Sequence, residues 1–331
     1  MKDFPSVRFE LRKNDELVDI ERIVIFDTCN LIDLVTNRNK KTDTLKGISK
    51  IFASESLVVI TEFTLAEIIL GSKTVEHLYN NSITLDECCF NILYFDKNII
   101  DHDSIINIKD EKQLKKLHKR VLYRLIKKTF PLFITVFRLH NCFIIESLID
   151  NKNKYYSKAI DFVQKIESNL KYKNILFDYH KKTYHEKKIN NMQLYNLFKQ
   201  LFIEEYKNEI NIMELENTFP NDIDIKTIKK FLLNYFDYKN INSSDSNEIY
   251  IQLLRKIRTL YPNNCNAIKY GYLDACIYIV LKNIFINRKY DKNDWVDILN
   301  ISTCYYESFI CDYITSDNNW KRFIEIINEI K

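Results

Sequence analysis

Four short apolar runs, three near the start of the chain and one near its end, stand out from the surrounding polar sequence. Each is of strand length and rich in β-branched or aromatic residues: residues 22–27, 57–60, 92–96 and 309–317. Uninterrupted runs of this length predict buried strands rather than half-exposed ones. Helical spacing follows the second run, with Thr61 in the position of an N-cap and Gly71 in that of a C-terminal stop. Strands alternating with helices predict a parallel sheet with right-handed crossovers.

The middle of the chain has a different pattern, in which apolar residues recur at helical spacing. Helices are predicted there at residues 109–128, 132–149, 154–170, 191–209, 224–238 and 247–260. Breaks fall at Pro131, at Pro220 and in the polar segment 241–246, which all carry turn chemistry. Further helices are predicted near residues 30–36 and 45–52, and in the C-terminal part from residue 272, from residue 293 and from residue 318. We interpret the middle of the chain as a helical insertion.

These elements predict an α/β fold. We expect a parallel sheet of four or five strands, with a large helical insertion. The first part of the core would span residues 1–100, the insertion 101–262 and the second part of the core 263–331. The final segment predicts an amphipathic helix, with no further strand after it.

Composition excludes two large classes of nucleotide-binding protein. The 331 residues include only three glycines, too few and too scattered for the glycine-rich loop of a dinucleotide-binding fold or a P-loop. The eight cysteines contain no C-x-x-C pair, so we interpret them as buried thiols in a reducing compartment. The N-terminus has no apolar leader, and the most apolar stretch, 130–145, carries Arg138 and His140. We therefore expect a soluble, cytoplasmic protein without a membrane segment.

Four acidic residues stand in positions that suit catalysis. Asp27 ends the first strand and Asp317 ends the last one, while Glu67 lies in the helix after the second strand. Asp274 is expected in the first turn of a buried helix. In an open parallel sheet the carboxyl ends of the strands share one edge, where ligands bind. Carboxylates gathered there would repel one another unless a cation neutralised them, and oxygen ligands suit Mg²⁺ or Mn²⁺.

Each acid also has an ordinary structural explanation. An aspartate after a strand is often a helix cap, and a glutamate on a helix is usually solvated. An acid in the first turn of a helix is favoured by the helix dipole. The four acids together are a more specific signal of a catalytic site than any one of them alone.

The segments that carry these acids resemble the acidic signatures of PIN-domain ribonucleases. The matching segments are IVIFDTCNLIDLV, VVITEFTLAEIILG, YLDACIYIVLKN and FICDYITSDNNW. The resemblance covers about residues 1–100 and 263–331. It assigns Asp27, Glu67, Asp274 and Asp317 as the catalytic and metal-binding acids.

The resemblance implies a three-layer α/β/α sandwich as the fold around the parallel sheet, and it implies a function as well. It implies cleavage of phosphodiester bonds in single-stranded RNA with Mg²⁺ or Mn²⁺, leaving 5′-phosphate and 3′-hydroxyl ends. Polar support for the metal or the phosphate would come from Thr315, with Thr28 or Asn30 as further candidates. Thr315 and Asp317 form a T-x-D motif. The segment before this motif also holds Asp294 and Asp297, either of which competes with Asp274 for the third acidic position.

A basic segment in the insertion is a candidate surface for RNA. Residues 109–128 contain nine Lys or Arg and two acids, with an apolar stripe at helical spacing. The candidate RNA-binding residues are Lys115, Lys116, Lys119, Arg120 and Arg124. The alternative is an ordinary solvated face. With a net charge of only +4, the distribution of charge matters more than the total.

Other functional classes share parts of this pattern. A strand ending in Phe-Asp is also typical of haloacid-dehalogenase phosphatases, but Cys29 stands where these enzymes need a second aspartate as acid and base. The second hypothesis is a PIN-like scaffold that has lost catalysis and serves as an RNA-binding or assembly module. A toxin-like, defence or RNA-processing role fits either one. A homodimer or an antitoxin-like protein would then be the protein partner.

Overall fold

The computed structural model describes most of the helices and the strands that the sequence predicts. The described residues are 8–10, 22–28, 30, 56–87, 91–94, 105, 107–186, 188–209, 211–235, 254, 267–286, 288–303, 310–315 and 317–330. The helices predicted at 30–36, 45–52 and 247–260 lie outside them, apart from Asn30 and Leu254.

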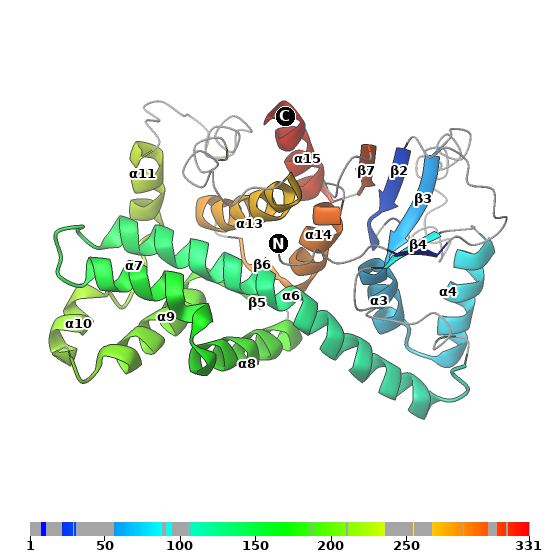
Figure 1. The fold of residues 1–331 in the computed structure, drawn as a ribbon, viewed down its shortest axis with the longest axis horizontal. Helices are drawn as coiled ribbons and strands as arrows, with labels where there is room; N and C mark the ends of the chain where they lie inside the picture. Colours follow the sequence, from blue (N-terminus) through cyan, green and yellow to red (C-terminus); the bar gives the residue numbers. More distant parts are fainter. Residues whose placement is uncertain are drawn as a thin grey trace. The chain divides into compact units, whose positions relative to one another are not determined.

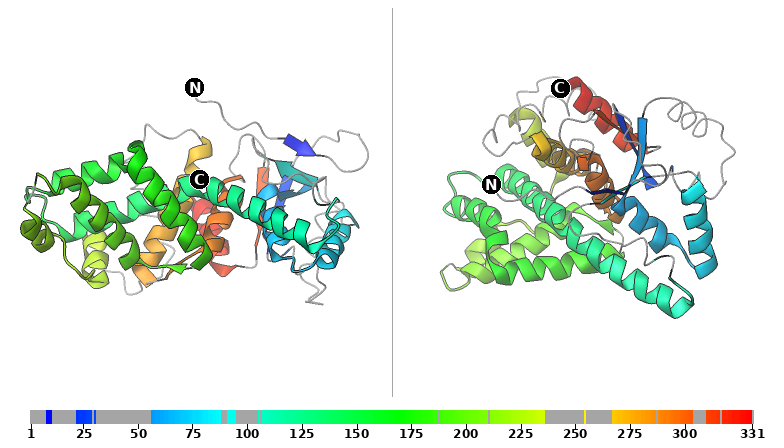
Figure 2. Two further views of the ribbon diagram at one scale, coloured as in Figure 1. Left: turned by 90° about the horizontal axis from the view of Figure 1, so that it is seen from below. Right: turned by 45° about the vertical axis from the view of Figure 1, so that its right-hand side comes forward.

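The chain divides into two compact units. The first consists of Met1–Lys128, Asn266–Gly271 and Val296–Lys321. The second consists of Thr129–Cys265, Tyr272–Trp295 and Arg322–Lys331. Four of the described helices contribute residues to both units, namely α6 (Glu111–Leu148), α13 (Ala267–Ile286), α14 (Lys292–Thr303) and α15 (Asn318–Ile330). Figure 1 labels these elements, and Figure 2 shows them from two further sides.

The first unit contains a five-stranded sheet. Its strands are β1 (Arg8–Glu10), β2 (Arg22–Phe26), β3 (Ser56–Thr61), β4 (Asn91–Tyr94) and β7 (Ile310–Ile314), in the order β1-β4-β3-β2-β7. The pairs β4–β3, β3–β2 and β2–β7 are parallel, and β1 pairs antiparallel with β4. The chain therefore builds the sheet outward from β2 through β3 to β4, and later returns to the other side of β2 with β7. Such a reversal of direction leaves a crevice at the carboxyl ends of the two strands that flank it.

The central strand β2 is buried because its sequence is apolar on both faces. Val24, Ile25 and Phe26 are each 1% exposed. Ile25 pairs with Val59 of β3 on one side and with Tyr313 of β7 on the other. Near-continuous β-branched and aromatic residues are typical of a strand covered on both faces.

Two helices follow β3 in the first unit. Helix α3 (Glu62–Gly71) begins at its N-cap Thr61, whose side chain accepts a hydrogen bond from the Thr64 amide at 3.1 Å. It ends at Gly71, so both predicted ends are confirmed. Helix α4 (Val75–Glu87) follows, and its first amide donates to Oε1 of Glu111 at 3.0 Å. That contact ties the start of α4 to the start of α6.

The second unit is built mainly from helices. They are α7 (Tyr156–Lys165), the 3₁₀ turn η1 (Ile166–Ser168), α8 (Leu170–Glu186), α9 (Asn191–Tyr206), α10 (Ile212–Thr218), α11 (Ile225–Tyr235) and most of α13 (Ala267–Ile286). A short antiparallel ribbon of β5 (Lys188–Ile189) and β6 (Tyr290–Asp291) joins segments distant in sequence. Aromatic side chains form part of its core, as where Phe162 meets Phe202 edge to face with ring centroids 5.6 Å apart. This unit therefore has a hydrophobic core of its own.

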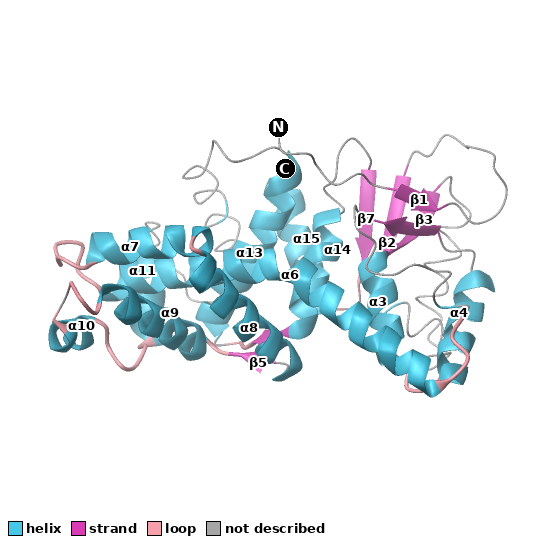
Figure 3. Cartoon of the chain, turned by 60° about the horizontal axis from the view of Figure 1, so that its bottom comes forward, coloured by secondary structure: helices cyan, strands magenta, loops and turns pink. Residues whose placement is uncertain are grey.

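The predicted fold class is wrong for this chain. We expected a three-layer α/β/α sandwich on a parallel sheet, but the described residues are mostly helical, as the colouring of Figure 3 shows. The strands are only two to six residues long, and β1 makes the larger sheet mixed rather than parallel. The physical reason is that the helical segments bury their apolar faces against one another. They form a compact unit of their own.

Helix α6 corrects the predicted break at Pro131. A proline inside a helix removes one backbone hydrogen bond and disfavours the helix by roughly 3 kcal/mol. Here Pro131 is exposed, whereas Leu132, Phe133 and Phe137 on the buried side are completely inaccessible. Burial of each such side chain contributes roughly 1.5 to 3 kcal/mol, which outweighs the cost of the proline. One helix of 38 residues therefore replaces two predicted ones.

Helix α13 begins earlier than the sequence predicts. We expected α13 to start after Gly271, with Asp274 in its first turn, but α13 starts at Ala267. Asp274 therefore lies inside the helix, and the prediction that it sits in the first turn is wrong. The run from Ala275 to Leu281 is completely buried, and this packing outweighs the roughly 1 kcal/mol cost of a glycine inside a helix.

Candidate functional site

The candidate site starts at the carboxyl ends of β2 and β7. Asp27 is the first residue after β2 and is 4% exposed. Thr315 is the first residue after β7, and its hydroxyl donates to Oδ2 of Asp27 at 2.5 Å. Because β2 and β7 are parallel neighbours, their ends lie together, and the bond joins residues 288 positions apart in sequence. This edge is where the order of the strands reverses, the usual location of a ligand site in an open parallel sheet.

A second threonine joins Glu67 to the same edge. The hydroxyl of Thr28, next to Asp27, donates to Oε2 of Glu67. Glu67 is half-buried in the second turn of α3, the helix that begins directly after β3. The predicted residues Asp27, Thr28 and Glu67 are therefore brought to adjoining positions by two neighbouring parallel strands.

Asp317 reaches the site through the backbone of the T-x-D segment. Its amide donates to the hydroxyl oxygen of Thr315 at 3.0 Å. Its carbonyl oxygen accepts from the amides of Trp320 and Lys321 at 3.1 and 3.0 Å, which starts α15. Since a hydroxyl has a single proton, Thr315 accepts from Asp317 while it donates to Asp27. The hydroxyl of Thr315 thus joins the segment of Asp317 to the carboxylate of Asp27.

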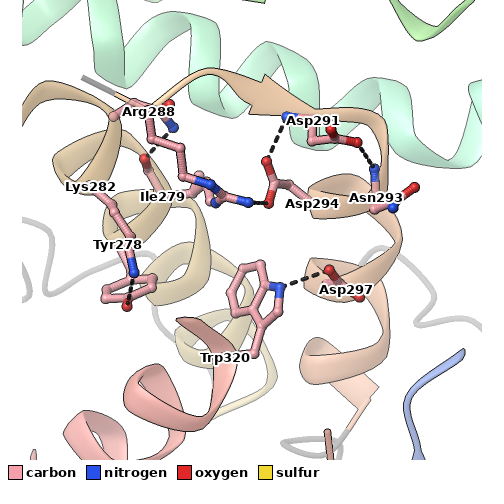
Figure 4. A network of polar contacts seen from close by, with 10 residues as sticks. Tyr278, Ile279, Lys282, Arg288, Asp291, Asn293, Asp294, Asp297 and Trp320 are labelled. Atoms are coloured by element: carbon pink, nitrogen blue, oxygen red, sulfur yellow. Dashed lines mark hydrogen bonds and ion pairs between the residues drawn. The ribbon is translucent and has the colours of Figure 1, made fainter. Parts of the chain in front are cut away.

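The other predicted acids have different environments. Asp274 belongs to the second unit, where α13 buries it completely. Asp294, also in the second unit, is 1% exposed and forms an ion pair of 2.7 Å with Arg288 (Figure 4). It also accepts the Asp291 amide at 2.7 Å at the start of α14. Burial raises the pKa of Asp294 to about 6, against the opposing effect of Arg288.

Asp297 makes a structural contact within the first unit. Its Oδ2 accepts from the indole nitrogen of Trp320 at 2.7 Å (Figure 4). Trp320 is completely buried, and a buried indole N–H needs an acceptor. This contact accounts for an acid on α14 without a metal. Asn30, the remaining auxiliary candidate, is 5% exposed and lies three residues beyond Asp27.

Sequence reasoning missed a polar network at the end of β3. The Thr61 hydroxyl donates to Oδ1 of Asn300 at 2.5 Å, and Nδ2 of Asn300 donates to the Thr64 hydroxyl at 3.2 Å. Glu62, which follows β3 directly, is completely buried. The available signal was the acid immediately after the strand, the same signal that identified Asp27. Nothing in the sequence pointed to Asn300, which lies 239 residues from Thr61.

The donor set limits the kinds of metal site that are compatible with this edge. Within the described ranges, no group of three or more His, Cys, Asp or Glu side chains is arranged to hold a metal ion. A structural zinc site needs four such ligands. Mg²⁺ is usually held by one or two carboxylates together with waters and substrate phosphates. The arrangement around Asp27 and Glu67 is therefore compatible with a substrate-assisted Mg²⁺ or Mn²⁺ site.

Comparisons with known proteins add no further information to this site. Neither protein-family models, nor curated proteins, nor solved structures give a match to the chain.

One described helix, α6, has the length and composition to cross a membrane. Half of its most apolar window is buried within the protein, and the core helix of a soluble protein passes the same test. The helix is therefore weak evidence for a membrane segment.

Proposed function

We propose that the chain is a divalent-metal-dependent ribonuclease that hydrolyses phosphodiester bonds of single-stranded RNA. The observation that carries the proposal is the hydrogen bond from Thr315 to Asp27 at the point where the order of strands reverses. The contact from Thr28 to Glu67 supports it, because it brings a second carboxylate to that edge. Single-stranded RNA as the substrate follows from the resemblance of these motifs to PIN-domain ribonucleases.

The residues of the site have separable roles in this proposal. Asp27 and Glu67 would hold Mg²⁺ or Mn²⁺, and the resemblance adds Asp317, whose amide donates to the Thr315 hydroxyl. The resemblance also assigns Asp274, which belongs to the second unit. A bound divalent ion lowers the pKa of a coordinated water and offsets the charge of the phosphate. Thr315 and Thr28 orient the carboxylates of Asp27 and Glu67 through their hydroxyls. Such outer contacts affect metal affinity or activity by about 10- to 100-fold.

Burial of the Asp27 side chain also favours this role. A carboxylate that is 4% exposed is costly to bury without partners, because ionised groups lose their hydration. Its hydrogen bond from Thr315 offsets part of that cost, and a cation would offset more. A helix-capping aspartate that is exposed to solvent would not carry this cost of burial.

The direct test is cleavage of an end-labelled single-stranded RNA by the purified full-length protein. We expect cleavage with Mn²⁺ or Mg²⁺, none with EDTA, and products with 5′-phosphate and 3′-hydroxyl ends. Asp27→Asn should lower the rate at least about 100-fold, because it removes a charged ligand. Asp178→Asn is the matched control, since Asp178 is an exposed acid on α8 in the second unit, and it should cleave like the wild type.

Two outcomes would contradict the proposal. Equal cleavage by wild type and Asp27→Asn would assign the activity to something other than this site. The absence of cleavage with every metal would favour the alternative, a scaffold that binds RNA or assembles with a partner without catalysis.

A further inference from the structure

The first half of α6 presents a continuous basic stripe. Its members are exposed and recur at intervals of three or four residues: Lys112, Lys115, Lys116, Lys119, Arg120, Tyr123, Arg124 and Lys127. We call these eight residues the basic stripe. Residues three and four apart share one face of a helix, so the seven cations and the tyrosine form a single surface. At 1.5 Å per residue the stripe is about 22 Å long.

No acidic residue interrupts this surface along the helix. The sequence from 112 to 128 contains no Asp or Glu, and Glu111 just before it is engaged by the Val75 amide. Like charges three or four residues apart destabilise a helix modestly. The helix is maintained by its other face, where Leu114, Leu117, Val121 and Leu125 are at most 3% exposed. Repulsion among these cations therefore disfavours the helix, and the concentration of positive charge matches a polyanion.

The surroundings of Tyr123 favour an unpaired polynucleotide. Tyr123 is 45% exposed, which makes it one of the few large hydrophobic side chains exposed among the described residues. The Nζ atom of Lys127 lies 4.6 Å from the centroid of its ring. Proteins that bind single strands combine a basic track for the backbone with aromatic rings on which bases stack. Tyr123 has both features, because Lys127 lies beside its ring and the other cations of the basic stripe continue along the helix.

A membrane surface is a poorer match for the same stripe. Helices that lie on membranes insert an apolar face next to their basic residues. In this segment the apolar face is already buried in the protein, as Leu114 and Val121 show with exposures of 1% and 0%. Only Tyr123 remains exposed among its hydrophobic residues.

We propose that the basic stripe of α6 binds the backbone of single-stranded RNA, with Tyr123 stacking on a base. This inference rests on the proposed function in that RNA is the substrate, but it concerns a surface on a different element from Asp27. Lys115, Lys116, Lys119, Arg120 and Arg124 are the residues that the sequence indicated, and the structure adds Lys112, Tyr123 and Lys127.

The test measures binding apart from cleavage. Full-length protein in EDTA is titrated into a fluorescent single-stranded RNA of about 20 nucleotides, and anisotropy is recorded over a range of salt concentrations. The stripe variant carries Lys115→Gln, Lys116→Gln, Lys119→Gln and Arg120→Gln. For single strands each phosphate contact contributes about 0.7 to the slope of log K against log salt. The slope should therefore fall by about 3, with affinity at least about tenfold weaker in low salt.

A control variant carries the same change in charge on the second unit. Lys165→Gln, Lys173→Gln, Lys181→Gln and Lys230→Gln alter four exposed lysines, and the salt slope should stay at the wild-type value. Tyr123→Leu should weaken binding about 5- to 100-fold without changing the slope, and Tyr123→Phe should restore it. Circular dichroism and thermal melting of every variant establish that it is folded.

The outcomes separate this inference from the proposed function. If the stripe variant and the control variant have the same salt slope, the stripe does not bind RNA, whether or not the wild type cleaves it. Cofloatation with anionic phospholipid vesicles that is lost in the stripe variant, with unchanged RNA binding, would also overturn it. If RNA binding depends on the stripe and the wild type still cleaves nothing, the ribonuclease proposal alone fails.

Discussion

The hydroxyl of Thr315 donates a hydrogen bond of 2.5 Å to Oδ2 of Asp27, although 288 positions separate the two residues in the chain. The bond exists because β2 and β7 are parallel neighbours and end together. The strands β3 and β4 of the same sheet, and most of the helical second unit, come between β2 and β7 in the sequence. The acidic edge is therefore assembled from the two ends of the sequence.

The first prediction concerns Thr315. Thr315→Val removes the hydroxyl but keeps the shape, so the Asp27 carboxylate loses one orienting contact. We expect the kcat/KM of RNA cleavage to fall about 10- to 100-fold, and Thr315→Ser to restore most of it. Thr218→Val, at a half-buried helical threonine of the second unit, should have no effect. A loss of activity in the serine variant as large as in the valine variant would contradict a role for the hydroxyl.

Much of the edge that holds Asp27 could be predicted from the sequence. Short apolar runs such as RIVIF are typical of buried strands, and β2, β3, β4 and β7 all lie where such runs occur. The start of helix α3 at Thr61 and its end at Gly71 were equally predictable from the sequence, because capping depends on local residues. The three-residue strand β1 was not predicted, since the charged sequence RFE has no strand pattern of its own.

The rest depended on contacts between distant residues. Asp294 and Asp297 could not be distinguished from metal ligands by position, because their partners Arg288 and Trp320 become evident only in the fold. The same applies to Pro131, whose effect on α6 is decided by burial on the opposite face. The fold class was mispredicted for a related reason. Apolar spacing predicts helices, but it does not show that they pack into a unit of their own.

The second prediction concerns the buried ion pair of Arg288 and Asp294. Arg288→Met leaves the Asp294 carboxylate buried without its partner, which should lower the free energy of unfolding by roughly 3 kcal/mol at pH 8. The pKa of Asp294, already raised from 3.8 to about 6, would rise further. A raised carboxyl pKa means that the folded state binds more protons, so the folded state gains stability as the pH falls through that pKa. The loss should therefore be smaller at pH 5 than at pH 8.

Urea unfolding at the two pH values measures this effect. Arg138→Met is the matched control, because Arg138 pairs with Glu167 at 3.0 Å and both side chains are more than a third exposed. Such surface pairs contribute at most about 1 kcal/mol. A loss for Arg288→Met that does not change with pH would show that Asp294 is not the titrating group.

The third prediction concerns Pro131. Pro131→Ala supplies an amide hydrogen inside α6 and removes the steric conflict of the ring with the preceding turn. Because Pro131 is exposed, alanine leaves no cavity. We expect the free energy of unfolding to rise by about 1 to 3 kcal/mol, measured by urea unfolding. Pro131→Gly should gain less than alanine, since glycine disfavours a helix by about 1 kcal/mol. A less stable alanine variant would show that the proline is needed for the packing of α6.

The fourth prediction concerns His140, a completely buried residue of α6. Burial lowers the pKa of His140 from 6.5 to about 4, and the nearby amides of Asn141 and Asn191 oppose this shift. Below pH 6.5 His140 therefore binds a proton in the unfolded chain, whereas in the folded protein it stays neutral until the pH falls to about 4. Stability is lost as the pH falls through this window. At about 1.4 kcal/mol per pKa unit, the contribution of His140 amounts to about 3 kcal/mol between pH 7 and pH 4.

Replacement of His140 by leucine isolates this effect from other titrating groups. Asp294 acts in the opposite direction over the same range, because its raised pKa stabilises the folded state as the pH falls. The difference in unfolding free energy between His140→Leu and the wild type cancels that contribution. It should shift in favour of the variant by about 3 kcal/mol from pH 7 to pH 4, measured by urea unfolding at each pH. A difference that stays constant over this range would mean that His140 is protonated as readily in the folded protein as in the unfolded chain.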